Sequence, residues 1–172
     1  CFGENNGVIS INISGGTPPY EYLWSNGLMV SNLYNIPAGS YTVTVNDFND
    51  CSITNTFVIT QPDELITIVN SQNVNCYGEN TGQVILNLTG GTFPYNFEWN
   101  NNSTSQSLID VFYGTYIVTV TDAHSCSAYA YAQITQPSLP LHGEITQTDV
   151  RCFGEGNGIA DLNVTGGTTP YY

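Results

Sequence analysis

Hydrophobic and polar residues alternate with a period of two along most of this chain. Ile9, Ile11 and Ile13 are separated by single polar residues, and the alternation returns at 84–88 and at 160–164. In a β-strand, residues i and i+2 point to the same face, so this pattern predicts strands with one buried and one solvated face. No segment shows the period of 3.6 residues that is typical of a helix. We therefore expect an all-β protein.

Two kinds of predicted strand carry many of the aromatic residues. One kind places three aromatic side chains on one face and ends in tryptophan, at 20–24 and 95–99. The other begins with tyrosine and continues with alternating valines, at 41–45 and 116–120. From this alternation we expect four aromatic residues in the core: Trp24, Trp99, Tyr41 and Tyr116.

Turn residues separate these strands. Ser-Asn-Gly-Leu at 25–28 predicts a tight hairpin, because Asn-Gly supplies the two positive φ angles of a type I′ turn. A four-residue turn after Asp47 leads to a strand at 52–60, and a further strand is expected at 65–74.

The complete pattern occurs almost three times. Cys-Phe-Gly-Glu at 1–4 returns as Cys-Tyr-Gly-Glu at 76–79 and as Cys-Phe-Gly-Glu at 152–155. The segments between these motifs follow in the same register. A period of this length fits one small domain, since solenoid units have about 20–50 residues. The chain is thus a series of domains.

Gln-Pro marks the domain boundaries, at 61–62 and 136–137. Proline lacks the backbone N–H that a central strand needs, so it is expected between strands. The boundaries predict a first domain at 1–62 that lacks its first strand, a complete domain at 63–137, and the N-terminal half of a third at 138–172. The linkers are short, so successive domains are expected to abut.

A complete domain is expected to contain about seven strands, with tryptophan on the third and Gly-x-Tyr before the sixth. This arrangement is typical of an immunoglobulin-like β-sandwich with a tyrosine corner. The expected fold is therefore a tandem array of such sandwiches.

The recurring motifs resemble the SprB repeat. They are Cys-x-Gly-x-x-x-Gly, Gly-Gly-Thr-x-Pro-Tyr, a tryptophan, Gly-x-Tyr-x-Val-x-Val-x-Asp, a cysteine and Ile-Thr-Gln-Pro. SprB repeats occur in very large cell-surface adhesins of gliding Bacteroidota that are exported by the type IX secretion system. The domain also resembles the polycystic-kidney-disease type of sandwich. The Trp-Asp-Phe-Gly-Asp-Gly signature of that type is missing after Trp24 and Trp99.

Composition narrows the classes of partner. The net charge is −13, and Arg151 is the one basic residue among 172. Nucleic acid and anionic membranes are therefore poor partners. No apolar run approaches about 18 residues, so membrane insertion is not expected. The chain starts and stops inside a repeat, which we interpret as a window in a longer array.

The sequence contains no set of residues that is typical of a catalytic site. His124 and His142 do not recur in the other repeats, and Glu21 and Glu98 lie on solvated strand faces. No cofactor is expected, and we do not expect an enzyme. An alternative is a carbohydrate-binding module, in which exposed tyrosine and asparagine side chains recognise polysaccharide.

Each complete repeat has two cysteines without a CxxC motif or a partner histidine, a pattern typical of disulfides in an oxidising compartment. The simplest pairing stays within a repeat, Cys1–Cys51 and Cys76–Cys126. Sandwich topology argues against it, because the loop after the first strand and the loop before the last lie at opposite ends. A strand of ~10 residues separates these ends by roughly 30 Å, whereas a disulfide needs Cα atoms within about 7 Å.

Stacking the domains along the chain suggests a second pairing. The end of the first domain that carries Cys1 would face the end of the second that carries Cys126. An interdomain Cys1–Cys126 disulfide follows, and Cys51, Cys76 and Cys152 would then pair with repeats outside this window. Both pairings remain open at this point.

Acidic residues gather at the same predicted junction. Glu4 lies near Cys1, Asp63 and Glu64 follow the boundary proline, and Asp122 lies near Cys126. Carboxylate oxygens are the ligands that Ca²⁺ prefers, so Glu4, Asp63 and Asp122 offer a calcium site. The alternative is that these side chains are simply solvated.

Together, these observations predict a non-enzymatic, secreted structural segment of a long adhesin filament on a bacterial surface. Its expected partners are neighbouring repeats of the same chain, a polysaccharide or substratum, and, through the full-length protein, the gliding machinery.

Overall fold

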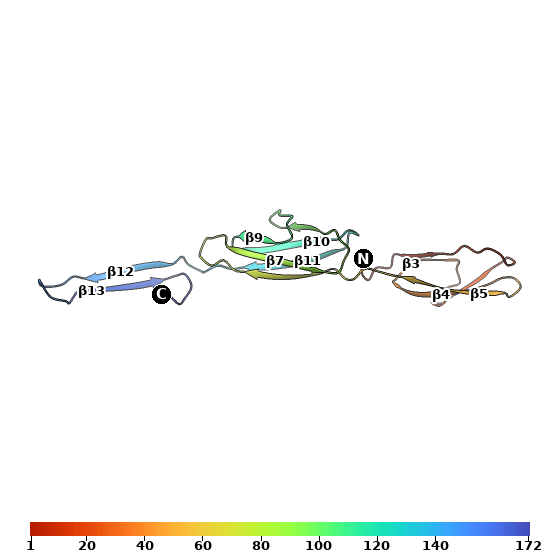
Figure 1. Cartoon of the computed structure of the whole chain (residues 1–172), viewed down its shortest axis with the longest axis horizontal. Coiled ribbons are helices and arrows are strands. Elements are labelled where there is room, and N and C mark those ends of the chain that lie inside the picture. Colours follow the sequence, from red (N-terminus) through yellow and green to blue (C-terminus); the bar gives the residue numbers. More distant parts are fainter. The chain divides into compact units, whose positions relative to one another are not determined.

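The structure is a computed structural model that describes all 172 residues. It is all-β, with antiparallel pairing throughout (Figure 1). No helix of the length and hydrophobicity needed to cross a membrane is present. The strands are β1 (Gly7–Ser10), β2 (Glu21–Trp24), β3 (Asn32–Ile36), β4 (Gly39–Asn46), β5 (Ser52–Ile59), β6 (Ile66–Gln72), β7 (Gly82–Thr89), β8 (Asn96–Trp99), β9 (Leu108–Val111), β10 (Gly114–Thr121), β11 (Ser127–Ile134), β12 (His142–Thr148) and β13 (Ile159–Thr165).

The chain divides into two compact units. The first comprises Cys1–Leu65 together with two short loops from later in the sequence, Gly90–Phe93 and Ala123–Cys126. The second comprises Ile66–Thr89, Pro94–Asp122 and Ser127–Tyr172. The strands β6 and β12 begin shortly after the two Gln-Pro motifs, and the proposed boundaries at Pro62 and Pro137 stay predictions.

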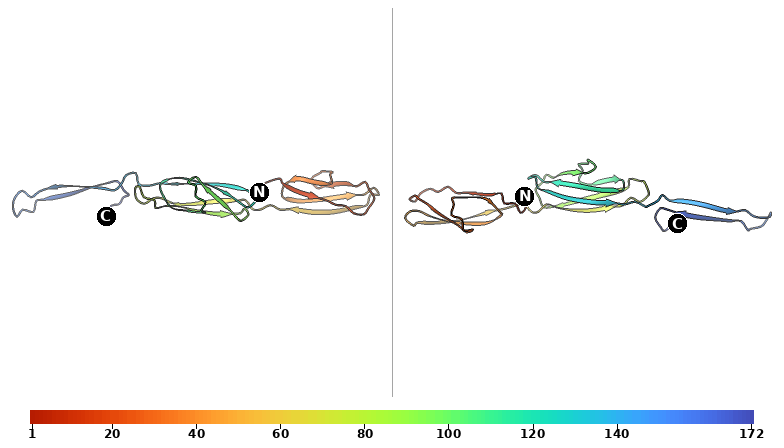
Figure 2. Two further views of the ribbon diagram at one scale, coloured as in Figure 1. Left: turned by 90° about the horizontal axis from the view of Figure 1, so that it is seen from above. Right: turned by 180° about the vertical axis from the view of Figure 1, so that it is seen from behind.

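The second repeat is an immunoglobulin-like β-sandwich of two three-stranded sheets. One sheet has the order β6-β7-β9 and the other β11-β10-β8, coloured green to cyan in Figures 1 and 2. Five inward-facing side chains of β7, β8 and β10 are almost completely buried: Val84, Leu86, Trp99, Val118 and Val120. The alternation in the sequence therefore predicted the buried faces correctly.

The number of strands differs from the expectation of about seven, because the second repeat has six. The missing element is a fourth strand between β8 and β9. Residues 100–107 form a loop there, and the chain crosses to the other sheet within it. An asparagine-rich stretch has low strand propensity, which is the physical reason for the difference.

The first repeat forms the same two sheets without a counterpart of β6. The pairs are β1-β3 in one sheet and β2-β4-β5 in the other. Its core lies around Trp24, which is 1% exposed and packs at 6.2 Å from the ring of Phe57. The surrounding buried residues are Ile9, Leu33, Ile36, Tyr41, Val43 and Val45.

The type I′ hairpin expected at residues 25–28 is wrong. The strands on either side belong to different sheets, since β2 pairs with β4 and β3 pairs with β1. Gly27 has a positive φ of 84°, whereas Asn26 does not. The turn is instead closed by two backbone hydrogen bonds, from Gly27 N–H to Trp24 O and from Trp24 N–H to Leu28 O, both 2.9 Å.

A tyrosine corner is present in both repeats. The Tyr41 hydroxyl donates to the Pro37 carbonyl, and the Tyr116 hydroxyl donates to the Phe112 carbonyl, both at 2.9 Å. Tyr41 is buried, as expected of a core residue, but Tyr116 is only half-buried. Even this partial burial raises the pKa of the Tyr116 hydroxyl above its usual value.

Residues 138–172 contain one antiparallel hairpin. Strands β12 and β13 pair from His142 opposite Thr165 to Thr148 opposite Ile159. They match β6 and β7 of the second repeat in sequence position, and nearly all of their side chains are exposed.

Candidate functional site

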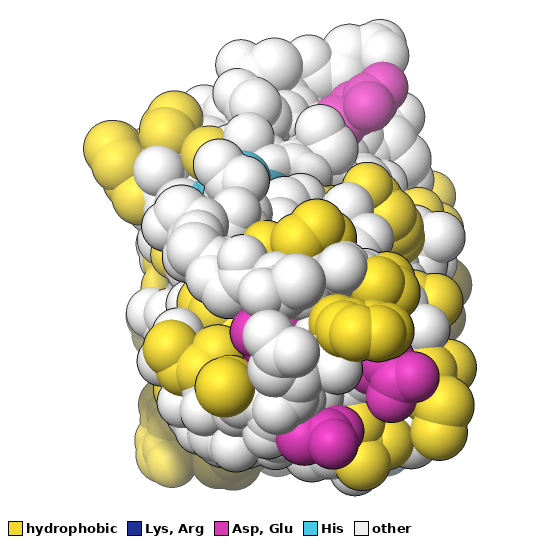
Figure 3. Space-filling model, turned by 90° about the vertical axis from the view of Figure 1, so that its right-hand side faces the viewer, with side chains coloured by type: hydrophobic (Ala, Val, Ile, Leu, Met, Phe, Trp, Pro, Cys, Tyr) yellow, Lys and Arg dark blue, Asp and Glu magenta, His cyan; other side chains and the backbone are white.

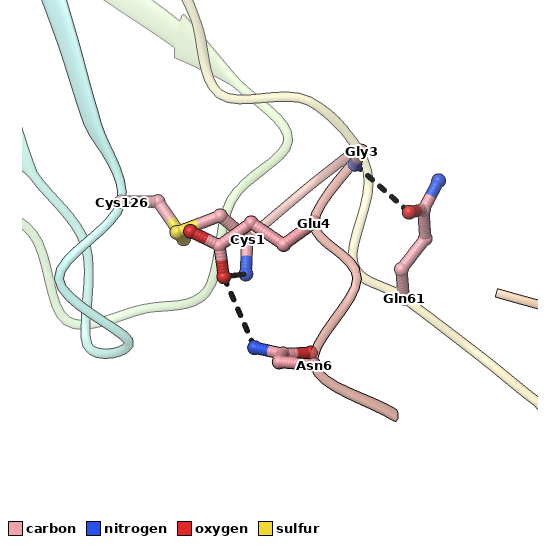
Figure 4. Close-up of a disulfide and its surroundings, with 6 residues drawn as sticks. All are labelled: Cys1, Gly3, Glu4, Asn6, Gln61 and Cys126. Atoms are coloured by element: carbon pink, nitrogen blue, oxygen red, sulfur yellow. Dashed lines mark hydrogen bonds and ion pairs between the residues drawn. A yellow bond between two sulfur atoms is a disulfide. The ribbon is translucent and has the colours of Figure 1, made fainter. Parts of the chain in front are cut away.

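A disulfide joins Cys1 to Cys126, which lie 125 positions apart in the sequence (Figure 4). Their Cα atoms are 5.3 Å apart, well inside the range that a disulfide allows. The bond links the first cysteine of one repeat to the second cysteine of the next, the pairing that sandwich topology favours. Pairing within a repeat is not found, because Cys51 and Cys76 are exposed free thiols, as is Cys152.

Hydrogen bonds hold the turn that follows Cys1. Gly3 has a φ of +73°, and its N–H donates to the side-chain oxygen of Gln61 at 2.9 Å (Figure 4). The Glu4 carboxylate accepts a hydrogen bond from the Asn6 amide at 3.0 Å. The Cys-x-Gly motif is therefore a turn whose glycine is held by Gln61.

The loop before the second cysteine is organised by an aspartate. In the first repeat, the Asp47 carboxylate accepts from the N–H groups of Thr17, Asn49 and Cys51, each at 2.9 Å. The hydrogen bonds from Thr17 and Cys51 are the main reason that the pKa of Asp47 lies below its usual value. In the second repeat the same position is Asp122, which is 3% exposed.

The Gly-Gly motif approaches the chain that follows Gln-Pro. Gly91 N–H donates to the Asp63 carbonyl at 2.9 Å. A Cβ on Gly90 would lie within 1.9 Å of the Glu64 carbonyl oxygen, and Gly90 has a φ of +70°. Gly166 repeats this approach at Pro140. Only glycine fits at Gly90 and Gly166, because a side chain would collide with the backbone of the chain that follows Gln-Pro.

The predicted calcium ligands do not form a metal centre. No group of three or more histidine, cysteine, aspartate or glutamate side chains in the structure is placed to hold a metal ion. Glu4 accepts a hydrogen bond from Asn6, and no buried polar side-chain atom lacks a hydrogen-bond partner. Calcium binding by Glu4, Asp63 and Asp122 stays an untested prediction.

One face of the molecule illustrates the charge balance of the surface. The face in Figure 3 displays scattered apolar and acidic side chains among polar groups and backbone, and no lysine or arginine, as expected from a net charge of −13. The positioning roles of Gln61 and Gln136 were missed at the sequence level. The recurrence of glutamine before both prolines was the available signal, but the Gln-Pro motif by itself indicates only a domain boundary.

A model of a known repeat family matches all three repeats of the chain. The SprB repeat model matches residues 1–29, 68–104 and 145–172, which together make up more than half of the chain. The chain belongs to the SprB repeat family. SprB repeats are found in cell-surface adhesins and are typical of structural rather than catalytic domains.

Curated proteins and solved structures are less informative about this chain than the family model. No curated protein matches the chain. Among solved structures, the chain is similar to one described as the structure of an amphioxus IgVJ-C2 molecule. That similarity has 12% identity and a TM-score of 0.39, over 77% of this chain and 98% of that one.

Proposed function

We propose that this chain is a load-bearing segment of an extracellular adhesin filament, in which disulfides connect each repeat to the next. The Cys1–Cys126 disulfide carries this proposal, because it joins the first cysteine of one repeat to the second cysteine of the next. Membership of the SprB repeat family supports the location on a cell surface. Exposed disulfides persist in oxidising surroundings, which fits a secreted protein.

The three free cysteines extend the proposal along the array. Cys51 is a second cysteine, whereas Cys76 and Cys152 are first cysteines. By repeat equivalence with Cys1 and Cys126, each is proposed to pair with the complementary cysteine of a flanking repeat. Each such bond requires a dithiol–disulfide oxidant, which takes up the two electrons and two protons that the thiols lose.

Membership of the SprB repeat family motivates proposals about the export and partners of the whole protein. The whole protein would be exported by the type IX secretion system of a gliding bacterium of the Bacteroidota, with domain boundaries at Pro62 and Pro137. Its partners would be neighbouring repeats, the substratum and, through the full-length protein, the gliding machinery. In this role the segment transmits force and performs no catalysis.

Single-molecule stretching tests the load-bearing role. Pulled from its two ends, the oxidised chain should extend less than the reduced chain by roughly 440 Å, because the disulfide shields the residues between Cys1 and Cys126 at about 3.5 Å each. Equal extension of the two forms would contradict the proposal. The Cys51→Ser variant is the matched control and should behave as the wild type.

Antibodies test the location and the role in adhesion. Fab fragments raised against this chain should label intact cells of the source bacterium and reduce their attachment and gliding. Labelling that appears only after the cells are permeabilised would contradict an extracellular adhesin.

A further inference from the structure

Two exposed tyrosines lie on the outer face of the sheet β11-β10-β8 in the second repeat. Tyr129 and Tyr131 are 69% and 76% exposed. They are two residues apart on β11, so they share one face with their Cα atoms about 7 Å apart. Large aromatic side chains that are so exposed contribute little to a core, and their presence calls for another explanation.

The strand register surrounds the tyrosines with groups that form hydrogen bonds. Thr119 lies directly opposite Tyr129 on one side and opposite Glu98 on the other. Ile117 lies opposite Tyr131. Directly opposed residues of antiparallel strands point to the same face, so Tyr129, Thr119 and Glu98 form one row across three strands.

A groove runs along the open edge of this sheet at β8. It has a volume of about 370 Å³ and lies beside the loop after Trp99, a size that accommodates a small ligand. Its lining combines amide, hydroxyl and carboxylate groups with the aromatic ring of Phe97. The polar lining residues are Asn96, Glu98, Asn102, Ser103, Thr104, Thr119 and Thr121. We name Tyr129, Tyr131 and this groove the tyrosine face.

The first repeat shows that the fold does not need these residues. Thr54 and Thr56 occupy the positions of Tyr129 and Tyr131, 75 residues earlier, and their hydroxyls bond to Thr44 and Thr42 at 3.1 and 2.9 Å. A groove of about 390 Å³ recurs there.

The lining of the recurring groove is different. Leu23 stands in place of Glu98, and Met29 stands in place of Thr104. The groove of the first repeat still has a carboxylate at Glu21 and an amide at Asn46. The same sandwich therefore carries a threonine ladder beside this groove in one repeat and two exposed tyrosines beside its counterpart in the next. The fold is thus compatible with either set of residues, and the tyrosine rings of the second repeat are exposed to a ligand.

We infer that the tyrosine face binds a neutral, β-linked pyranose chain. The apolar C–H face of a sugar ring with equatorial hydroxyls packs on a tyrosine ring. Amide, hydroxyl and carboxylate groups of the groove bond to the hydroxyls at the edge of the sugar. The chain has a net charge of −13 and one basic residue, so an anionic polysaccharide is disfavoured. This binding function goes beyond the load-bearing role and does not depend on it.

Titration of the 172-residue chain with cellohexaose and laminarihexaose, followed by NMR and calorimetry, tests the inference. At least one of these neutral glucans should bind and shift the resonances of Tyr129, Tyr131 and Thr119. The double variant Tyr129→Ala, Tyr131→Ala should bind about tenfold more weakly or worse. The double variant Thr54→Ala, Thr56→Ala, at the equivalent place in the first repeat, is the matched control and should bind as the wild type does.

Three further measurements make the outcome decisive. The Tyr131→Phe variant should keep both fold and binding, since it retains the ring. Polygalacturonate, an anionic glycan, should not bind. Absence of binding to both neutral glucans, equal binding by the double tyrosine variant, or sedimentation showing that the tyrosines mediate self-association would each overturn the inference. The stretching result for the disulfide would be unaffected in every case.

Discussion

The side-chain oxygen of Gln136 accepts a hydrogen bond from the backbone N–H of Gly78 at 2.9 Å. Gln61 and Gly3 form the same bond at the same length in the first repeat, and both pairs are separated by 58 residues. The glutamine at the end of a repeat therefore holds the turn that carries its first cysteine. Proline follows each glutamine, so the Gln-Pro motif also fixes the cysteine-bearing turn through a hydrogen bond.

Loss of the hydrogen bond between Gly78 and Gln136 should destabilise the second repeat. We expect the Gln136→Ala variant to lose about 1 kcal/mol of unfolding free energy, the typical contribution of one hydrogen bond. Urea denaturation followed by tryptophan fluorescence measures the change. Gln147→Ala, on the exposed strand β12, is the control and should stay within about 0.5 kcal/mol of the wild type.

We expect Gly90→Ala to lower the unfolding free energy more than Gly15→Ala does. Both glycines have positive φ angles, but a Cβ on Gly15 meets nothing within 4 Å, whereas one on Gly90 meets the Glu64 carbonyl oxygen at 1.9 Å. We expect Gly15→Ala to cost about 1 kcal/mol from backbone strain alone. Gly90→Ala should cost at least about 2 kcal/mol more, because the backbone must shift. Similar unfolding free energies for the two variants would show that the close approach is unimportant.

Reduction of Cys1–Cys126 should lower stability more than any single hydrogen-bond deletion. The disulfide closes a loop that spans 125 positions. The chain-entropy model gives a stabilisation of about 4–5 kcal/mol for a loop of this size. Thermal unfolding of the wild type and of the Cys1→Ser, Cys126→Ser variant measures it. A Cys51→Ser variant, which loses only a free thiol, should melt at the wild-type temperature.

Acid should weaken the first repeat through Asp47. Backbone N–H donors lower the pKa of Asp47 in the folded state, so the folded protein binds this proton less readily than the unfolded chain. The resulting stabilisation is complete above the unfolded pKa of about 3.9 and is lost as the pH falls through the folded pKa.

The Asp47→Asn variant should therefore show a flatter loss of stability below pH ~4 than the wild type. Asp50→Asn removes the same charge from the same turn and serves as the control. Parallel acid-unfolding curves for the wild type and Asp47→Asn would show that this carboxylate does not contribute.

The sequence alone determined which residues are buried and how often the domain repeats. Alternation with a period of two reports the two faces of a strand directly, and Trp24 and Trp99 are buried as it predicted. Strand length and disulfide geometry argued against the pairing within a repeat but left both pairings open, and the structure decided for Cys1–Cys126.

The tertiary structure decided which strands pair and which polar groups meet. Local turn chemistry at Asn26-Gly27 is compatible with a hairpin, yet β3 pairs in the other sheet, because burial of Leu33 and Ile36 outweighs the preference of the turn. Glu4, Asp63 and Asp122 are close in the predicted topology, but whether three carboxylates converge depends on atomic distances that no pattern encodes. The contact of Gly90 with Glu64 is likewise invisible in the sequence, because it joins two backbone segments and involves no side chain.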